Sequence, residues 1–148
     1  MRVKWAAIMV AAVVDWLLGA VWFTIFANQW RAGLRMPPDE LQAYMSHPFF
    51  WPYLIALLAS IVMAYAIARM VASSETHGLF RGIVAGILVG LAAGAAMVTE
   101  MVFEIRPGSF VLIAAGYPLV GSILMGIIIG VWPSKAAALL HPSAQTKA

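Results

Sequence analysis

Apolar residues in this chain fall into four long blocks that are separated by short polar segments. The blocks cover about residues 5–27, 52–72, 79–103 and 109–132. Each block is close to the roughly 20 residues that a helix needs to cross about 30 Å of hydrocarbon. Because a segment inside a bilayer must satisfy its own backbone hydrogen bonds, blocks this long are predicted to be helices. The pattern predicts an all-α membrane protein, a four-helix transmembrane bundle that forms one domain over residues 1–148.

The first connection, residues 28–51, is the longest segment between the blocks and is predicted to lie outside the membrane. Pro38 followed by Asp39 and Glu40 is typical of a helix start, because proline fits the first turn and carboxylates favour the positive end of the helix dipole. Apolar residues then fall on one face of this segment until Pro48. We expect a short helix that lies on the outer membrane interface.

The remaining connections are short and make neighbours of the helices that they join. The polar loop 73–78 joins the second and third blocks, and Arg106, Pro107 and Gly108 form a tight turn before the fourth. Both pairs are therefore expected to pack antiparallel. Residues 141–148 are expected to form a frayed tail.

Basic residues at the ends of the blocks indicate the orientation in the membrane. Cytoplasmic segments carry an excess of lysine and arginine, and an inside N-terminus gives the larger basic count to the inner segments. The inner set is then Arg2, Lys4, Arg69, Arg81, Lys135 and Lys147, and the outer set is Arg31, Arg35 and Arg106. We expect a multi-pass protein of the bacterial cytoplasmic (inner) membrane with both termini in the cytoplasm.

Small residues recur at every fourth position within the blocks. Lipid gives no hydrophobic drive for helix association, so close backbone approach at small residues has to provide it. The glycines predicted to pack helices are Gly82, Gly86, Gly90, Gly94, Gly126 and Gly130. The second block shows the same spacing in Ala56, Ser60, Ala64 and Ala68. Such stripes favour tight packing within one bundle, or pairing with a second copy or another membrane protein.

Asp15 lies near the middle of the first block, on the same stripe as Ala7, Ala11 and Gly19. A carboxylate at that depth costs roughly 2.5–3.5 kcal/mol on insertion scales, so its side chain is expected to face protein rather than lipid. No basic residue lies at matching depth in any block. Asp15 is therefore either protonated, or ionised and hydrogen-bonded to water and backbone donors. Its role is either a hydrogen bond across helices, or a proton relay or substrate contact.

Glu100 and Glu104 are the acidic residues near the outer end of the third block. At 100° per residue, both lie within about 60° of the mean direction of the glycines, so they are expected to face the bundle. Arg106 follows closely and is expected to pair with Glu104 or Glu100. The pattern indicates an ion pair that caps the outer end of the bundle.

Pro118 interrupts the fourth block, where it removes one helical hydrogen bond. Tyr117 and Ser122 are hydrogen-bond donors beside it. If this kink faces Thr99 and Glu100, a small polar cavity forms in the outer half of the bundle. The alternative is a kink with no cavity.

Composition excludes several classes of protein. The chain is 64% hydrophobic and 10% charged, whereas a soluble domain is about half apolar and one quarter charged. The net charge of +3 is spread singly along the chain, which does not indicate a nucleic-acid partner. There is no cysteine, and His47, His77 and His141 have no metal-ligand spacing. Without a catalytic or nucleotide-binding motif, we expect no enzyme, no cofactor and no metal.

Several short elements occur together in a recognisable order. They are Gly19-x-x-Trp22-Phe23, Phe103-Glu104-x-Arg106-Pro107, Gly116-Tyr117, Met125-Gly126 and Trp132. This combination resembles the bacterial membrane-protein family catalogued as domain of unknown function 1761, over nearly the whole chain. The resemblance implies a small membrane protein with about four spans and adds no mechanism.

The patterns support one main hypothesis and two alternatives for function. The glycine stripe favours a non-enzymatic protein that acts by helix association in the lipid bilayer, as a homo-oligomer or an accessory subunit of another membrane protein. Asp15, Glu100, Glu104 and the kink at Pro118 motivate a small proton-linked transporter. The stripes also allow a binder of a hydrophobic small molecule between helices.

Overall fold

A computed structural model describes residues 4–46, 50–73 and 78–133 of the chain. Four of its helices are long and apolar enough to cross a membrane, and a short helix follows the first of them, so the predicted fold class is confirmed. The helices are α1 (Trp5–Ile25), α2 (Ala27–Leu34), α3 (Pro38–Ser46), α4 (Trp51–Ala72), α5 (Leu79–Phe103) and α6 (Gly108–Val131). The protein is therefore a multi-pass membrane protein built from α-helices.

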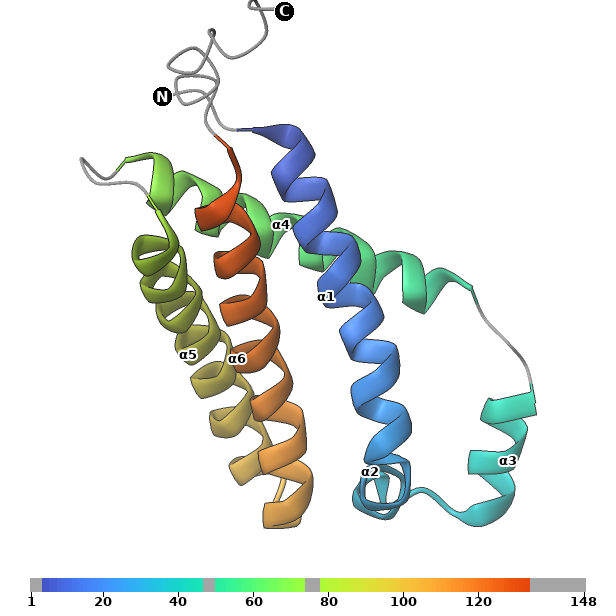
Figure 1. Ribbon diagram of the computed structural model, residues 1–148. Helices are drawn as coiled ribbons and strands as arrows, with labels where there is room; N and C mark the ends of the chain where they lie inside the picture. The colour runs from blue at the N-terminus through green and yellow to red at the C-terminus, as the bar shows by residue number, and fades with distance from the viewer. Residues whose placement is uncertain (1–3, 47–49, 74–77, 134–148) are drawn as a thin grey trace, which may run out of the picture.

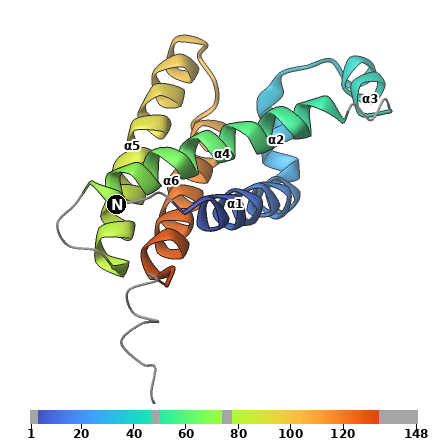
Figure 2. The same cartoon turned by 90° about the horizontal axis from the view of Figure 1, so that it is seen from above.

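The long helices do not all run side by side. Helices α5 and α6 form an antiparallel pair with the most extensive contact in the structure, and α1 packs on α6 (Figure 1). Helix α4 crosses the other three at a steep angle, and its first turns extend beyond α1 towards α3 (Figures 1 and 2). The predicted antiparallel packing of the second and third spans is thus limited, because α4 and α5 touch along a small part of their lengths.

The core lies where α4 crosses α1 and α6. Ala11 and Ala12 of α1 are fully buried there, together with Ala64 and Ile67 of α4 and Met125 of α6. Alanine occupies most of the crossing positions because its single methyl group lets two helix backbones approach closely. Helix α1 begins and α6 ends at the same end of the bundle, while α2 and the α5–α6 turn lie at the other (Figure 1).

The segment after α1 contains one helix more than the pattern predicts. Helix α3 begins at Pro38, where the acidic first turn predicts it, but α2 was expected to be loop. The chain leaves helical geometry at Phe26 (φ −97°, ψ 20°) and turns into α2. Arg35 then ends α2 in the left-handed region at φ 53°. Gly33 explains why α2 is held in place, because a Cβ there would overlap the ring of Phe110.

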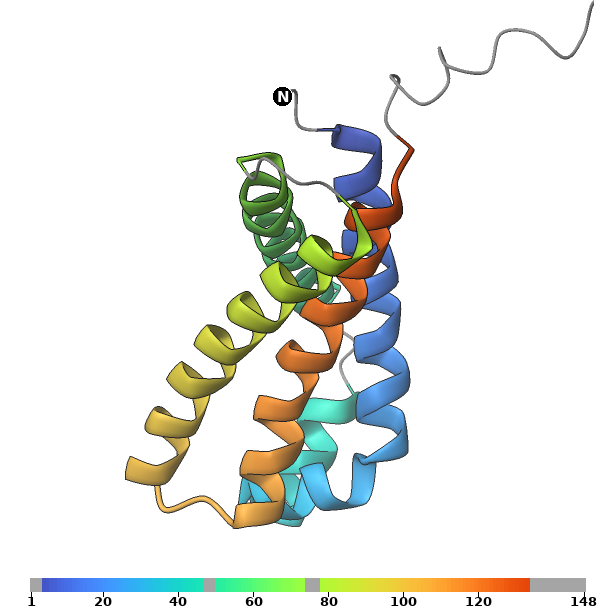
Figure 3. The ribbon, with the colours of Figure 1, turned by 60° about the vertical axis from the view of Figure 1, so that its left-hand side comes forward.

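The contact between α5 and α6 becomes looser from Gly82 to Gly94, and we call this gradual separation of the two helices the taper. At Gly82 and Gly86, a Cβ atom would overlap backbone atoms of Gly126 and Ser122. At Gly90 it would lie 2.7 Å from the Cα of Leu119, and at Gly94 3.2 Å from the carbonyl oxygen of Ala115. The helices therefore touch backbone to backbone near Gly82 and separate towards the α5–α6 turn, as Figure 3 shows.

Candidate functional site

The most unusual polar group of the structure is the carboxyl of Asp15, which is 3% exposed in the middle of α1. Ser60 of α4 donates a hydrogen bond to its Oδ2 from Oγ at 2.6 Å. Tyr117 of α6 donates to the same Oδ2 from its hydroxyl at 3.2 Å. The three residues join α1, α4 and α6 at one point, and we call them the carboxyl cluster.

Two glycines make room for the carboxyl cluster. A Cβ at Gly121 of α6 would overlap the Oδ1 of Asp15, so the carboxyl lies directly against the α6 backbone. A Cβ at Gly19 of α1 would lie 3.0 Å from the hydroxyl oxygen of Tyr117, so the phenol lies against the α1 backbone. Each polar side chain thus reaches the neighbouring helix because that helix lacks a side chain at the contact.

Both donors of the cluster also have a second acceptor within reach. The Oγ of Ser60 is 3.1 Å from the carbonyl oxygen of Ala56, one turn earlier in α4. The hydroxyl of Tyr117 is 3.2 Å from the backbone carbonyl oxygen of Asp15. A hydroxyl carries one proton that can rotate between acceptors, and two lone pairs that can accept.

This geometry gives the Oδ2 atom of Asp15 a hydrogen-bond partner in either protonation state. When Asp15 is ionised, Ser60 and Tyr117 both donate to it. When Asp15 is protonated on Oδ2, it donates to Ser60 across the same 2.6 Å, and Ser60 turns its proton to Ala56. Tyr117 then donates to the backbone carbonyl. The exchange needs rotation of two hydroxyl groups and no movement of a heavy atom.

Of this cluster, Asp15 and Tyr117 were expected from the sequence as polar candidates, and Ser60 was expected only as a packing residue. Tyr117 was placed beside Pro118 and the outer acidic residues, whereas its hydroxyl reaches towards α1. The sequence does not show that Asp15 and Ser60 lie at the same depth in the bundle, because this depends on the steep crossing of α4.

The outer acidic residues do not join the cluster. The prediction that Glu100 and Glu104 face the bundle is wrong, because both are exposed. Arg106 pairs with Glu104, its Nε lying 2.7 Å from Oε2, as the sequence allowed. The taper explains the error, because α5 and α6 have moved apart at this depth and α6 does not cover these residues (Figure 3).

Arg106 also binds the end of α2, which the sequence did not indicate. Its Nη1 donates to the carbonyl oxygens of Gly33 and Leu34, each at 3.0 Å. Its guanidinium lies 5.6 Å from the ring centroid of Phe110, and Trp30 stacks on Phe110 with 4.4 Å between the ring centroids. These contacts tie α2 to the α5–α6 turn and close that end of the bundle.

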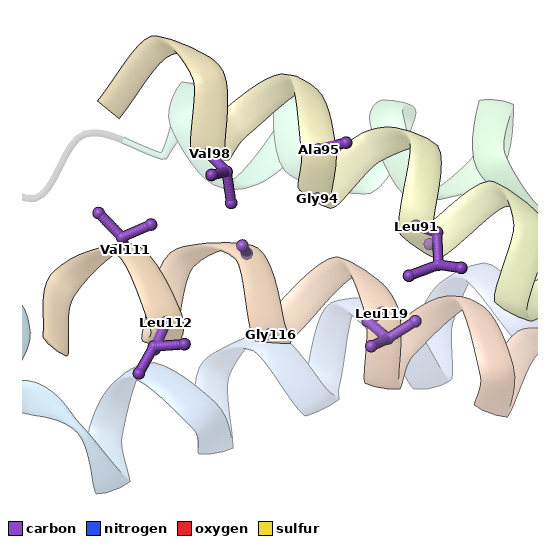
Figure 4. A pocket seen from close by; sticks show the side chains of 10 residues that line it. Leu91, Gly94, Ala95, Val98, Val111, Leu112, Gly116 and Leu119 are labelled. Atoms are coloured by element: carbon purple, nitrogen blue, oxygen red, sulfur yellow. The ribbon is translucent and has the colours of Figure 1, made fainter. Parts of the chain in front are cut away.

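A groove lies between α5 and α6 where they diverge, and its lining is apolar, unlike the polar cavity that was one of two alternatives for the region of Pro118. Its volume is about 350 Å³. Thr99 donates to the carbonyl oxygen of Ala95 in its own helix, and Tyr117 is engaged at Asp15. The groove is lined by Gly90, Leu91, Gly94, Ala95, Val98, Val111, Leu112, Ala115, Gly116 and Leu119 (Figure 4).

Within the described ranges, no three histidine or acidic residues come together in a way that could hold a metal ion. His47, His77 and His141 lie outside those ranges. The carboxyl cluster is thus a hydrogen-bonding site made of one carboxyl and two hydroxyl groups.

The family of the chain follows from a comparison with protein-family models. Residues 6–130 match the model described as "Protein of unknown function (DUF1761)", which takes in all four long helices. The chain belongs to this family. The match covers the carboxyl cluster and the glycine interface of this DUF1761 protein. No curated protein and no solved structure matches the chain.

Proposed function

We propose that this DUF1761 protein is a non-enzymatic protein that works by associating with other transmembrane helices, as a homo-oligomer or as an accessory subunit. The observation that supports this proposal is the position of α4. Its first turns extend past α1 with little support from the rest of the bundle (Figure 2). The hydrogen bond from Nε1 of Trp16 to the carbonyl oxygen of Tyr53, at 3.0 Å, ties them to α1.

The faces open to association differ from those that the glycine pattern suggested. Gly82, Gly86 and Gly90 face α6 within the same chain. The exposed apolar residues of α4, among them Leu58 and Val62, are 53% and 67% exposed and lie on a helix that crosses its neighbours steeply. A helix from a second chain that packs along α4 would fill the space that this crossing leaves. Association in lipid then depends on close packing and not on a hydrophobic drive.

We further propose that the protein lies in a bacterial cytoplasmic membrane with both termini on the cytoplasmic side. The excess of basic residues in the segments at that end supports this orientation. The start of α1 and the end of α6 at one end of the bundle agree with it (Figure 1). Labelling of single cysteines at Lys4 and Ile105 with a membrane-impermeant reagent in intact cells tests it. Labelling at Lys4 alone contradicts the proposal.

The absence of native cysteine makes the association directly testable. We would place single cysteines at Leu58 and Val62 of α4, with Val13 of α1, which is also exposed, as a control. Oxidation in native membranes should give disulfide-linked dimers at the α4 positions and few at Val13. For an accessory subunit, native mass spectrometry should give a complex with one stoichiometric partner. A lone monomer in several mild detergents and in nanodiscs, with no cross-link, contradicts the proposal.

The carboxyl cluster favours a second candidate function, that of a small proton-linked transporter. Ionisable residues inside membrane helices commonly mark proton or substrate pathways. Asp15 has hydrogen-bond partners in both protonation states, which is what a carboxyl that takes up and releases a proton requires. Its hydrogen-bond partners are the hydroxyl groups of Tyr117 in α6 and Ser60 in α4.

Asp15→Asn in proteoliposomes tests this second candidate. The asparagine keeps the shape of the side chain and cannot bind a proton. With a pH-sensitive dye inside the vesicles, the unaltered protein should conduct protons or a coupled solute, and Asp15→Asn should not. Asp39→Asn on the exposed helix α3 is the matched control and should behave like the unaltered protein. Flux equal to that of empty liposomes contradicts the candidate.

A further inference from the structure

We propose that the carboxyl cluster accepts a proton and excludes alkali cations, and that Ser60 sets this selectivity. Hard cations prefer oxygen ligands, and the cluster offers a carboxyl, two hydroxyl groups and two backbone carbonyl oxygens. Its composition would therefore suit a cation as well as a proton, and the geometry has to decide between them. This inference deepens the transport candidate, on which it rests for the use made of the ion.

The distance between Ser60 and Asp15 fits a shared proton. The Oγ of Ser60 lies 2.6 Å from the Oδ2 of Asp15, and a hydrogen bond between a hydroxyl group and a carboxylate is typically about 2.5–2.7 Å long. Two oxygens that share a cation lie farther apart. Even the small ion Mg²⁺, which holds an octahedral set of oxygens at about 2.0–2.1 Å, spaces neighbouring oxygens by about 2.9 Å. An alkali cation such as Na⁺ is larger, so Ser60 and Asp15 would have to separate to admit it.

The backbone of α6 prevents the carboxyl from making that room. The Oδ1 of Asp15 occupies the place that a Cβ of Gly121 would take, so the carboxyl already lies against α6. Both hydrogen bonds to the carboxyl go to the other oxygen, Oδ2. A cation would have to enter between Oδ2 and the hydroxyl groups of Ser60 and Tyr117, which already lie within hydrogen-bond distance of it.

The helices cannot spread to admit a cation without losing contacts in the core. Ala11 and Ala12 lie one turn before Asp15 in α1, and Ala64 lies one turn after Ser60 in α4. All three alanines are fully buried in the close-packed crossing of the helices. Widening the gap between Asp15 and Ser60 by a few tenths of an ångström would open these contacts. Exchange of a proton needs only the rotation of hydroxyl groups, so it leaves the packing intact.

Among the described residues, no charged side chain takes the place of the two hydroxyl groups at Asp15. The helices that pack on α1 are α2, α4 and α6, and Tyr117 is the titratable residue of α6 that contacts the carboxyl. The other charged or titratable residues of these helices are exposed, and they are Arg31 in α2 and Tyr53, Tyr65 and Arg69 in α4. Binding of a proton at Asp15 is thus governed by its own carboxyl and the two hydroxyl groups.

Infrared difference spectroscopy of the full chain in nanodiscs reads the protonation of Asp15 directly, because a protonated carboxyl has a C=O stretching band that disappears on ionisation. The band that is missing in Asp15→Asn belongs to Asp15. The midpoint of its pH titration should be the same in Na⁺, in Li⁺ and in choline, a cation too large for the site. A competing cation would lower this midpoint by about one pH unit for each tenfold rise in its concentration above its dissociation constant. Such a shift in the unaltered protein overturns the proposal, and so does the absence of a titrating band.

Two buried serines provide a matched pair of variants. Ser60→Ala removes the hydroxyl group that contacts Asp15 and leaves space beside Oδ2, so Li⁺ should now lower the midpoint. Ser122 of α6 is also buried, and its Oγ has no hydrogen-bond partner within the described part of the chain. Ser122→Ala removes the same atom and should keep a midpoint that is independent of the cation. Equal sensitivity of the two variants to Li⁺ overturns the role of Ser60, and circular dichroism shows whether both remain helical.

The infrared measurement and the flux measurement separate this inference from the transport candidate. A titrating band that is independent of the cation, found without any proton flux, refutes the transport candidate and supports the selectivity of the site. Flux that is driven by a gradient of Na⁺ and lost in Asp15→Asn supports transport and overturns the selectivity.

Discussion

The graded approach of α5 to α6 predicts a graded series of stabilities for glycine-to-alanine variants. Alanine adds one methyl group and is favoured over glycine in a helix by about 1 kcal/mol, so the variants differ only in what that methyl group meets. At Gly82 and Gly86 it overlaps backbone atoms of α6, which cannot rotate away. The helices must separate along their closest contact.

The magnitudes follow from the distances. Carbon atoms in contact lie about 3.5–4.0 Å apart, so Gly90→Ala, with 2.7 Å to Leu119 Cα, requires about 1 Å of separation. Gly94→Ala, with 3.2 Å to the oxygen of Ala115, requires a few tenths of an ångström. Overpacking typically costs 1–3 kcal/mol. We expect Gly82→Ala and Gly86→Ala to lose about 2–3 kcal/mol, Gly90→Ala about 1 kcal/mol, and Gly94→Ala to be neutral or slightly stabilising.

Reversible unfolding in mixed micelles, followed by tryptophan fluorescence, gives the free energy of unfolding for each variant. The order of the four free energies of unfolding is the decisive result, because all four variants share the same unfolded state in the micelles. Equal losses at all four positions, or a larger loss at Gly94 than at Gly82, would refute the taper. Circular dichroism of each variant shows whether the helices themselves remain.

Three further predictions concern the polar contacts. Tyr117→Phe removes one hydrogen bond to the buried carboxyl and should cost about 1–3 kcal/mol in the same unfolding measurement. Gly121→Ala should cost about 1–3 kcal/mol because its methyl group displaces the carboxyl of Asp15, and a double-mutant cycle should show the cost vanish in an Asp15→Ala background. Arg106→Ala removes two hydrogen bonds to the end of α2 and should lower stability by about 1–2 kcal/mol. Glu104 is the exposed partner in the ion pair, so Glu104→Ala should change stability by less than about 1 kcal/mol. Thermal melting of both variants tests this difference.

Length and hydropathy along the chain were sufficient for the four long helices, because a bilayer allows few alternatives to a helix of about 20 apolar residues. The start of α3 at Pro38 was equally predictable, because proline and two acidic residues favour a helix N-terminus. Helix α2 was not predictable in this way. Its position depends on Gly33 meeting Phe110 and on Arg106 binding its last carbonyls, and both contacts join residues more than seventy positions apart.

Only part of the candidate site could be predicted from the sequence. Asp15 stands out in any apolar block, since a carboxyl there is expensive. Its partner Ser60 is one small residue among several, and helical periodicity does not indicate which residues of two helices lie at the same depth. That depth is set by the crossing angle of α4, which arises from the packing of alanines at the core. Glu100 was misplaced for a related reason, because periodicity gives a direction around α5 but not how closely a neighbouring helix approaches there.

The α5–α6 pair is in closest contact at Gly82 and has separated at its turn, so it has the geometry of a lever whose pivot lies near Gly82. A small rotation at the pivot becomes a larger displacement of the turn, some 30 Å along the helix by its rise per residue. Arg106 holds that far end to α2. Changes in bilayer thickness act on the ends of long helices. Any force that moves the ends of α5 and α6 apart would therefore have to act against the hydrogen bonds of Arg106 to α2.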